Sequence, residues 1–138
     1  MKTLFSLVTL ALLSLPVHAD EAPPDVVQVC ASFFNQLRDG KVSDAYALLL
    51  RGSKIGDKLE EVTKLQDRTH EMIQTYGQIR GYELVSADFY GKNLCRVTYL
   101  TRSDNVPVRW RITFYRPADQ WRVFNLQLDD AVMEFFGK

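Results

Sequence analysis

The clearest alternation of apolar and polar residues in this chain runs from Cys95 to Leu128. Three segments there, CRVTYLTRS, VPVRWRITFYR and WRVFNLQL, repeat with a period of two, which is typical of antiparallel strands with one buried face. If Asp104 and Asn105 form the first turn, with the left-handed backbone of a tight hairpin, Tyr99 faces Trp110. The same register pairs Thr101 with Val108, Val97 with Ile112 and Cys95 with Phe114. A slip of one residue would turn arginines toward the core, so the pattern favours this register.

The segments before this meander have apolar residues at helical spacing. They predict three helices, over about 25–40 with Asp25 as the N-cap, 43–52, and 58–76 with a buried stripe that starts at Leu59. A first strand follows from about Ile79 to Tyr90, and a short apolar helix capped by Asp129-Asp130 closes the chain. The predicted fold class is α+β, with N-terminal helices packed on a four-stranded antiparallel sheet.

Residues 1–19 have the features of a secretory signal peptide. Lys2 precedes an apolar run from Leu4 to Leu15, and Val17-His18-Ala19 fits the small-x-small rule for cleavage. We expect cleavage after Ala19, a single domain over residues 20–138, a periplasmic or secreted location, and no membrane span after cleavage.

The charge balance excludes some classes of partner. The chain has 17 Lys and Arg against 17 Asp and Glu. Nucleic-acid binding and a polybasic membrane-surface role both need a basic face, so neither is expected.

The two cysteines, Cys30 and Cys95, lie on the apolar faces of the first helix and of the sheet. In an oxidising compartment two cysteines suggest one disulfide, and we predict a Cys30–Cys95 bridge. The alternative is two buried free thiols that act as small hydrophobic residues.

Four segments resemble the nuclear transport factor 2-like (cystatin-like) cone fold: FFNQLRDGKVSDAYALL, TYGQIRGYELVSADF, VRWRITFYR and DQWRVFNLQL. The chain is most similar to small secreted bacterial members of unknown function. The resemblance implies a curved sheet that wraps the helices and leaves a cavity at the wide end of the cone. Members include enzymes, ligand carriers and interaction domains, so the fold does not choose among these functions.

Candidates for catalysis are few. Asp88 lies on the first strand beside Ser86 and Tyr90, and a buried carboxylate there could act as a base. The other interpretation is an aspartate that faces water. His70 is the only histidine after the signal peptide and has no second ligand at helical spacing, so we expect neither a metal nor a cofactor. Whether the chain is an enzyme stays open, with a non-catalytic role favoured.

Binding has two candidate surfaces. The cavity of the cone could be lined by Tyr46, Tyr76, Tyr99 and Trp110 and hold a small apolar ligand, although these side chains could instead fill the core. The polar sheet face could be the interface of a homodimer or of a protein partner. It carries Arg96, Arg109, Arg111 and Tyr115, with Leu100, Arg122 and Phe124 among them. This face could instead be solvated, or the C-terminal tail could cover it.

The sequence therefore predicts a secreted, non-catalytic binding domain for an apolar ligand or a partner protein. The alternative is a small cavity enzyme, isomerase-, dehydratase- or hydrolase-like, that uses a buried carboxylate and a tyrosine.

Overall fold

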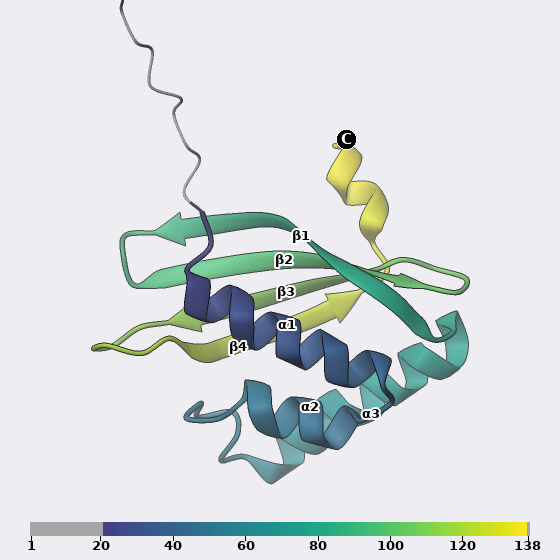
Figure 1. Ribbon diagram of the computed structural model, residues 1–138, viewed down its shortest axis with the longest axis horizontal. Coiled ribbons are helices and arrows are strands. Elements are labelled where there is room, and N and C mark those ends of the chain that lie inside the picture. The colour runs from purple at the N-terminus through teal and green to yellow at the C-terminus, as the bar shows by residue number, and fades with distance from the viewer. Residues whose placement is uncertain (1–20, 138) are drawn as a thin grey trace, which may run out of the picture.

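The computed structural model describes residues 21–137, so the predicted signal peptide and its cleavage site lie outside the described residues. The chain is α+β, with three helices packed against a four-stranded antiparallel sheet of order β1-β2-β3-β4 (Figure 1). In chain order the elements are α1 (Pro24–Arg38), α2 (Val42–Leu49), α3 (Leu59–Tyr76), β1 (Ile79–Tyr90), β2 (Leu94–Ser103), β3 (Val108–Tyr115), β4 (Arg122–Asp129) and the 3-10 helix η1 (Val132–Phe136).

The predicted register of β2 and β3 is confirmed. Tyr99 pairs with Trp110, and the other three predicted pairs are also present. The apolar side chains of both strands consequently share one face, which we call the inner face. The opposite face, which carries Arg96, Arg109 and Arg111, is called the outer face.

The turn between β2 and β3 differs from the prediction. No residue other than glycine has a positive φ within residues 21–137, so the left-handed backbone expected at Asp104-Asn105 was wrong. The Asp104 carboxylate instead accepts hydrogen bonds from the Gln78 amide and from Arg80 Nε, at 3.2 and 2.7 Å. The Asn105 amide donates to the carbonyl of Tyr76 at 2.8 Å. Long-range bonds to the α3–β1 junction therefore fix this loop.

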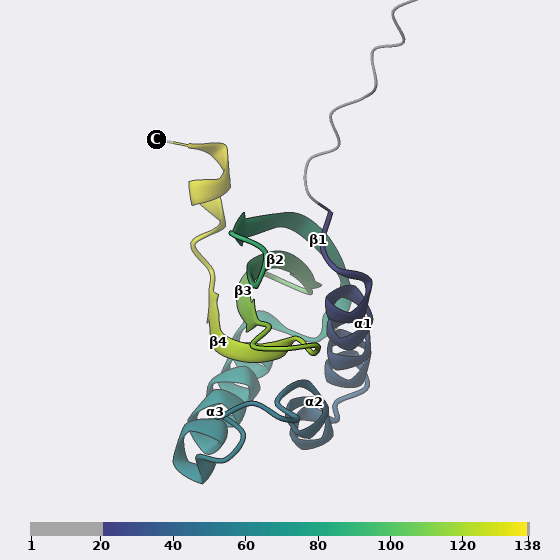
Figure 2. The same cartoon turned by 90° about the vertical axis from the view of Figure 1, so that its left-hand side faces the viewer.

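The core lies between the inner face of the sheet and the helices, and the sheet curls around α1 (Figure 2). Phe33 and Phe34 project from α1 and contact Trp110 edge-on, with ring centroids 5.7 and 5.5 Å apart. All three side chains are fully buried. Helix α1 thus supplies the aromatic surface against which the central strands pack.

Two details of the helices correct the sequence analysis. Helix α1 begins at Pro24, so Asp25 lies inside the first turn and is not the N-cap. Leu59 is 80% exposed and does not belong to the buried stripe of α3, whose buried residues are Thr69 and Met72.

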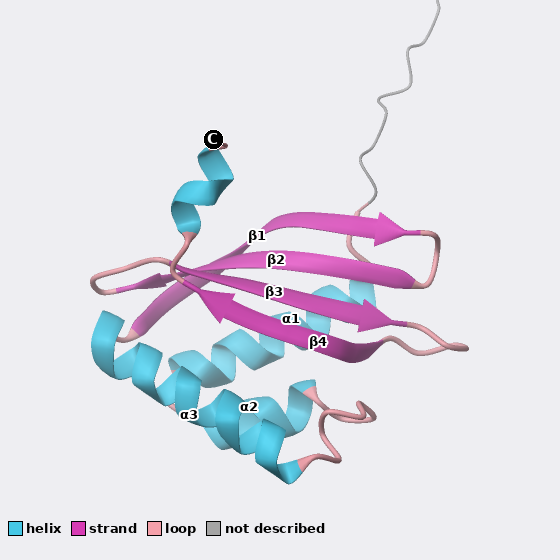
Figure 3. Cartoon of the chain, turned by 180° about the vertical axis from the view of Figure 1, so that it is seen from behind, coloured by secondary structure: helices cyan, strands magenta, loops and turns pink. Residues whose placement is uncertain are grey.

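The C-terminal tail lies on the side of the sheet away from the helices (Figure 3). It consists of η1, whose N-cap is Ala131 and has no side-chain capping bond, so the predicted Asp129-Asp130 cap was wrong. Asp129 instead accepts a hydrogen bond from the Ala131 amide at 3.0 Å just before the helix. The tail carries Met133, Phe135 and Phe136, which are 73%, 40% and 82% exposed.

Candidate functional site

Three of the four predicted ligand-binding residues lie inside the packed core. Trp110 is fully buried, and its indole N–H donates to Thr101 Oγ1 at 2.9 Å. The Tyr46 and Thr69 hydroxyls are hydrogen-bonded at 2.7 Å. Tyr99 is 2% exposed and packs on Phe34. Their rings and polar atoms are satisfied by neighbouring side chains, as in an ordinary core.

Tyr76 lies apart from the other three. Its hydroxyl donates to Asp130 Oδ2 at 2.8 Å, and this bond raises the pKa of Tyr76. It lines a small cleft of about 230 Å³ between α3 and the end of β4, together with residues such as Arg68 and Glu71. The structure therefore does not bring the four predicted ligand residues around one cavity.

Asp88 and His70 are both exposed. Asp88 lies on the outer face, paired with Arg96 in the β1–β2 ladder, and its carboxylate is 3.9 Å from the Arg96 guanidinium. Its side chain is 52% exposed, which agrees with the interpretation of an aspartate that faces water. No group of three or more potential metal ligands occurs within the part of the chain that the structure describes.

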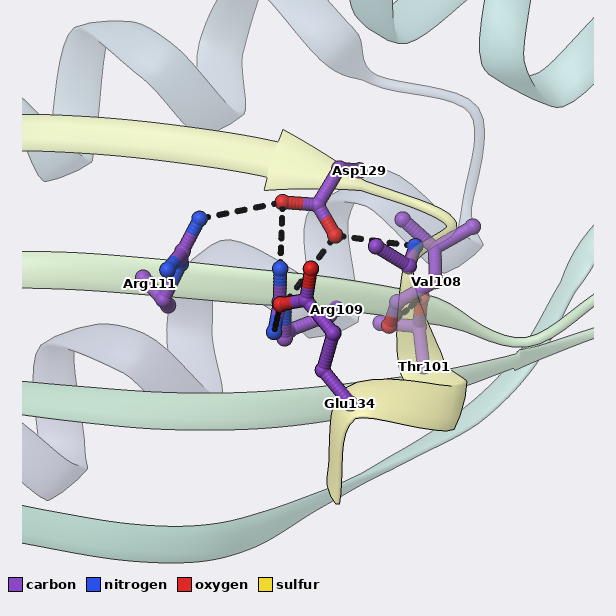
Figure 4. Close-up of polar contacts among 7 residues, drawn as sticks. Thr101, Val108, Arg109, Arg111, Asp129 and Glu134 are labelled. Atoms are coloured by element: carbon purple, nitrogen blue, oxygen red, sulfur yellow. Dashed lines mark hydrogen bonds and ion pairs between the residues drawn. The ribbon is translucent and has the colours of Figure 1, made fainter. Parts of the chain in front are cut away.

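Arg109 is not an open interface residue, because the tail covers it (Figure 4). Its guanidinium makes two 3.0 Å hydrogen bonds to the Asp129 carboxylate and a 2.8 Å bond to Glu134, and it lies 5.7 Å from the centroid of the Phe135 ring. Only 7% of Arg109 is exposed. The prediction that Arg109 stands free on the outer face is corrected, and the alternative of a covering tail is found at this end of the sheet.

The charges of this cluster stabilise one another. Burial raises the pKa of Asp129, but the hydrogen bonds from Arg109 and Ala131 outweigh it, so the pKa lies below its usual value. The bond to Asp129 contributes most to the raised pKa of Arg109. Arg111 also donates to Asp129, at 3.1 Å. Arg109, Asp129 and Glu134 thus join β3, β4 and η1 into one unit.

The remaining predicted interface residues are more accessible. Arg96 is exposed near β1, and Tyr115 is 46% exposed at the opposite end of β3 from Arg109. Tyr115 pairs with Arg122 in the β3–β4 ladder and lines a groove that we call the β4 groove. The groove residues are Gly52, Ser53, Lys54, Ile55, Lys58, Glu61, Tyr115, Pro117, Arg122, Val123, Phe124 and Asn125.

A β-bulge creates the β4 groove. Thr113 pairs with Asn125 but Phe114 pairs with Val123, so Phe124 is an extra residue on β4. Val123 turns inward and is buried, whereas Phe124 is 65% exposed. The hollow beside it has a volume of about 590 Å³ and is lined by Tyr115, Phe124, Ile55 and Pro117 among others. An aromatic-lined hollow with charged residues at its rim is suited to binding.

The loop between α2 and α3 closes the other side of the groove and is fixed in place. Ser53 is buried, and its hydroxyl donates to the Val123 carbonyl at 2.6 Å. The same oxygen accepts from the Ile55 amide at 3.1 Å. These bonds attach the loop to the edge of β4, so the groove is preformed. Phe124 was among the residues that the sequence placed on the polar sheet face, but Ser53 was not predicted, because its contact with β4 depends on the tertiary fold.

Cys30 and Cys95 are both fully buried in the core, as expected, and both are free thiols in the structure. Burial raises the pKa of Cys30 to about 12 and that of Cys95 to about 11. Thiols with such pKa values are protonated at neutral pH and react slowly. The disulfide between them stays a prediction.

The comparisons with known proteins give no relative: no family model, no curated protein and no solved structure matches the chain. Among the described residues, no helix combines the length and the apolar character that crossing a membrane requires.

Proposed function

We propose that this chain is a non-catalytic binding domain that engages a partner protein through the β4 groove, outside the cytoplasm. The observation that carries the proposal is the exposure of Phe124 and Tyr115 over a preformed hollow, while the interior aromatics are fully packed. Large apolar side chains gathered at one surface are typical of protein interaction sites.

The openness of the groove favours a protein over a small apolar ligand. Sites for small molecules bury most of the ligand surface, about 70–90%. The walls of the β4 groove are strongly exposed, at 65% for Phe124 and 46% for Tyr115. A segment of a partner chain could cover these rings from outside, with Lys58 and Arg122 at the rim.

The enzyme alternative has less support. Asp88 is solvated and paired with Arg96, and the tyrosines of the core bond to other side chains of the core. A cavity enzyme needs a carboxylate and a hydroxyl that converge on one space. The described residues offer no such pair at Asp88.

We further propose the nuclear transport factor 2-like cone as the specific fold. Its support is the order of the elements, with three helices before a four-stranded meander, and the curl of the sheet around α1 (Figure 2). An experimental structure with a flat sheet that leaves α1 uncovered would contradict the cone.

Site-specific photo-crosslinking tests the binding proposal. A photoreactive phenylalanine at position 124, in the cells that make the protein, should give a protein adduct of defined mass. Tyr115→Ser in the same chain should weaken that adduct, because it removes the second wall of the groove. The matched control is the same photoreactive residue at Val85, which is 45% exposed and lies on β1. Absence of an adduct from position 124, or an equal one from position 85, would count against the proposal.

A further inference from the structure

The tail and the β4 groove are two exposed apolar surfaces on one chain. Met133 and Phe136 of η1 are 73% and 82% exposed. Tyr115 and Phe124 of the groove are 46% and 65% exposed. Within the described part of the chain, no segment covers either surface. Both surfaces consist of large apolar side chains, so each could bury the other.

Both surfaces are accessible from the outer face of the sheet but lie at its opposite ends. The tail contacts Arg109, which pairs with Asp129 at one end of the β3–β4 ladder. The groove includes the pair Tyr115–Arg122 at the other end. At the rise of a β-strand these ends are about 20 Å apart. A 3-10 helix of the length of η1 spans only about 10 Å, so the tail does not reach the groove of its own chain.

We infer that a second copy of this chain occupies the β4 groove, with the tail of each copy lying in the groove of the other. This inference rests on the proposed function and names the partner that the groove receives. The arrangement closes under two-fold symmetry. A two-fold axis that runs across the strands, between two outer faces, lays β4 over β4 in opposite directions and brings each tail over the partner's groove.

Contacts with Arg109 hold the tail in a fixed position on the outer face. Arg109 bonds Glu134 at 2.8 Å and lies under the Phe135 ring. These contacts use the Glu134 and Phe135 side chains and leave Met133 and Phe136 outward. Holding the apolar residues in place before contact reduces the entropy that association costs.

Charge supports the same occupant. The tail, η1, carries one acidic residue, Glu134, and no basic residue. The groove contributes Arg122 at its rim, and its two lysines are in exposed pairs with Asp57 and Glu61, at 3.8 and 3.4 Å. Glu134 of one copy, whose side chain is 67% exposed beside Arg109, could therefore approach Arg122 of the other without leaving a buried charge unpaired.

Sedimentation equilibrium of the chain from residue 20 onward tests the association. We expect a dimer. Phe136→Ser and Phe124→Ser should each weaken dimerisation by about tenfold or more, because each removes one side of the same contact. The double variant should be no weaker than either single variant. Val85→Ser is the control and should leave the dimer unchanged, since Val85 lies near α1 and away from the outer face. A monomer, an open series of larger assemblies, or an equal effect of Val85→Ser would overturn the inference.

Crosslinking between isotopically distinct chains tests the reciprocal geometry. A photoreactive phenylalanine replaces Phe136 in a nitrogen-15-labelled chain, which is mixed with unlabelled chains. Crosslinks should join the labelled tail to residues 52–58 or 115–125 of an unlabelled chain. Crosslinks confined to one chain, or to other residues of the second chain, would overturn the inference.

Failure of this inference is distinguishable from failure of the proposed function. If the chain is monomeric but position 124 captures a different protein, and Tyr115→Ser weakens that capture, the second copy is wrong and the binding groove stands. If position 124 captures neither a second copy nor another protein, both proposals are wrong.

Discussion

Trp110 and Tyr115 lie on the same strand, β3, and face opposite sides of the sheet. Trp110 is fully buried among other rings, and its N–H is bonded to Thr101. Tyr115 is 46% exposed over the β4 groove. The difference shows that an abundance of aromatic residues does not locate a binding site in this chain. What locates it is where an aromatic ring lacks a neighbour to pack against.

The two ends of the outer face differ in a similar way. At the Arg109 end, the tail supplies a carboxylate and a ring that bury the guanidinium. At the Tyr115 end, the bulge turns Phe124 outward and no segment of the described chain covers it as the tail covers Arg109. One end therefore contributes to stability, and the other is available for binding.

Trp110→Ala should give the largest loss of stability. It removes a fully buried ring and leaves the Thr101 hydroxyl without its donor, so we expect a loss of about 4 kcal/mol in the free energy of unfolding. Urea denaturation measures it. The control is Trp121→Ala, a partly buried ring beside Arg116, with an expected loss of about 1 kcal/mol. Equal losses would mean that the inner aromatics are not the core of the fold.

The predicted Cys30–Cys95 bridge should come next. If it forms, reduction should lower the free energy of unfolding by about 3 kcal/mol, because the bridge restricts the unfolded chain. The intact mass of the protein from its own compartment should correspond to a chain that begins at Asp20 and lacks two hydrogen atoms. A mass with both hydrogens, and thiols that react only after unfolding, would show that the cysteines remain as the free thiols of the structure.

Arg109→Ala should cost about 2 kcal/mol, because it leaves the partly buried Asp129 carboxylate without its two-pronged partner. Arg109→Lys should recover only part of this loss, since an ammonium group does not reproduce the paired hydrogen bonds. Thermal and urea unfolding measure both variants. Arg122→Ala is the matched control at the exposed end, with an expected change below about 0.5 kcal/mol. A small effect of Arg109→Ala would restore Arg109 as an interface residue.

The sequence was sufficient to predict features that follow from a local period. Alternation along β2 and β3 predicted the pairing of Tyr99 with Trp110, because shifting the register would have buried charges. The bounds of β1 and the existence of three helices followed from the same kind of pattern. Burial of Cys30 and Cys95 followed from their positions on these faces.

Features that depend on distant contacts were not predictable in this way. Phe124 lies on the outer face, as expected, but strict alternation with Leu126 would place it in the core, so its outward position depends on a bulge that was not predicted. The burial of Arg109 depends on a tail that folds back over the sheet. Asp104 has a role in bonding Arg80 rather than in forming a left-handed turn. The sequence placed Tyr115, Arg122 and Phe124 on the polar face, but the hollow between them and the α2–α3 loop depends on the bulge and on the Ser53 contact, which no local period predicts.

Tyr46→Phe should have a moderate effect. The substitution keeps the buried ring and removes the 2.7 Å hydrogen bond to Thr69, so the expected loss is about 1 kcal/mol. Tyr115→Phe is the control, and its exposed hydroxyl should contribute nothing measurable to stability. A double-mutant cycle with Thr69→Val isolates the bond. Additive losses in that cycle would mean that the two hydroxyls are not coupled.

Phe124→Ser should have the smallest effect on stability, although it replaces a large aromatic residue within a strand. The ring is 65% exposed at a bulge, so the free energy of unfolding should change by less than about 0.5 kcal/mol. Leu126→Ser on the same strand replaces a side chain that is only 8% exposed, and it should destabilise the fold by about 3 kcal/mol. Association should show the reverse order. Phe124→Ser should weaken it, whereas the protein with Leu126→Ser should associate normally under conditions where it is still folded. If Phe124→Ser unfolds the chain, its ring stabilises the monomer, and the β4 groove would lose the residue on which its binding role depends.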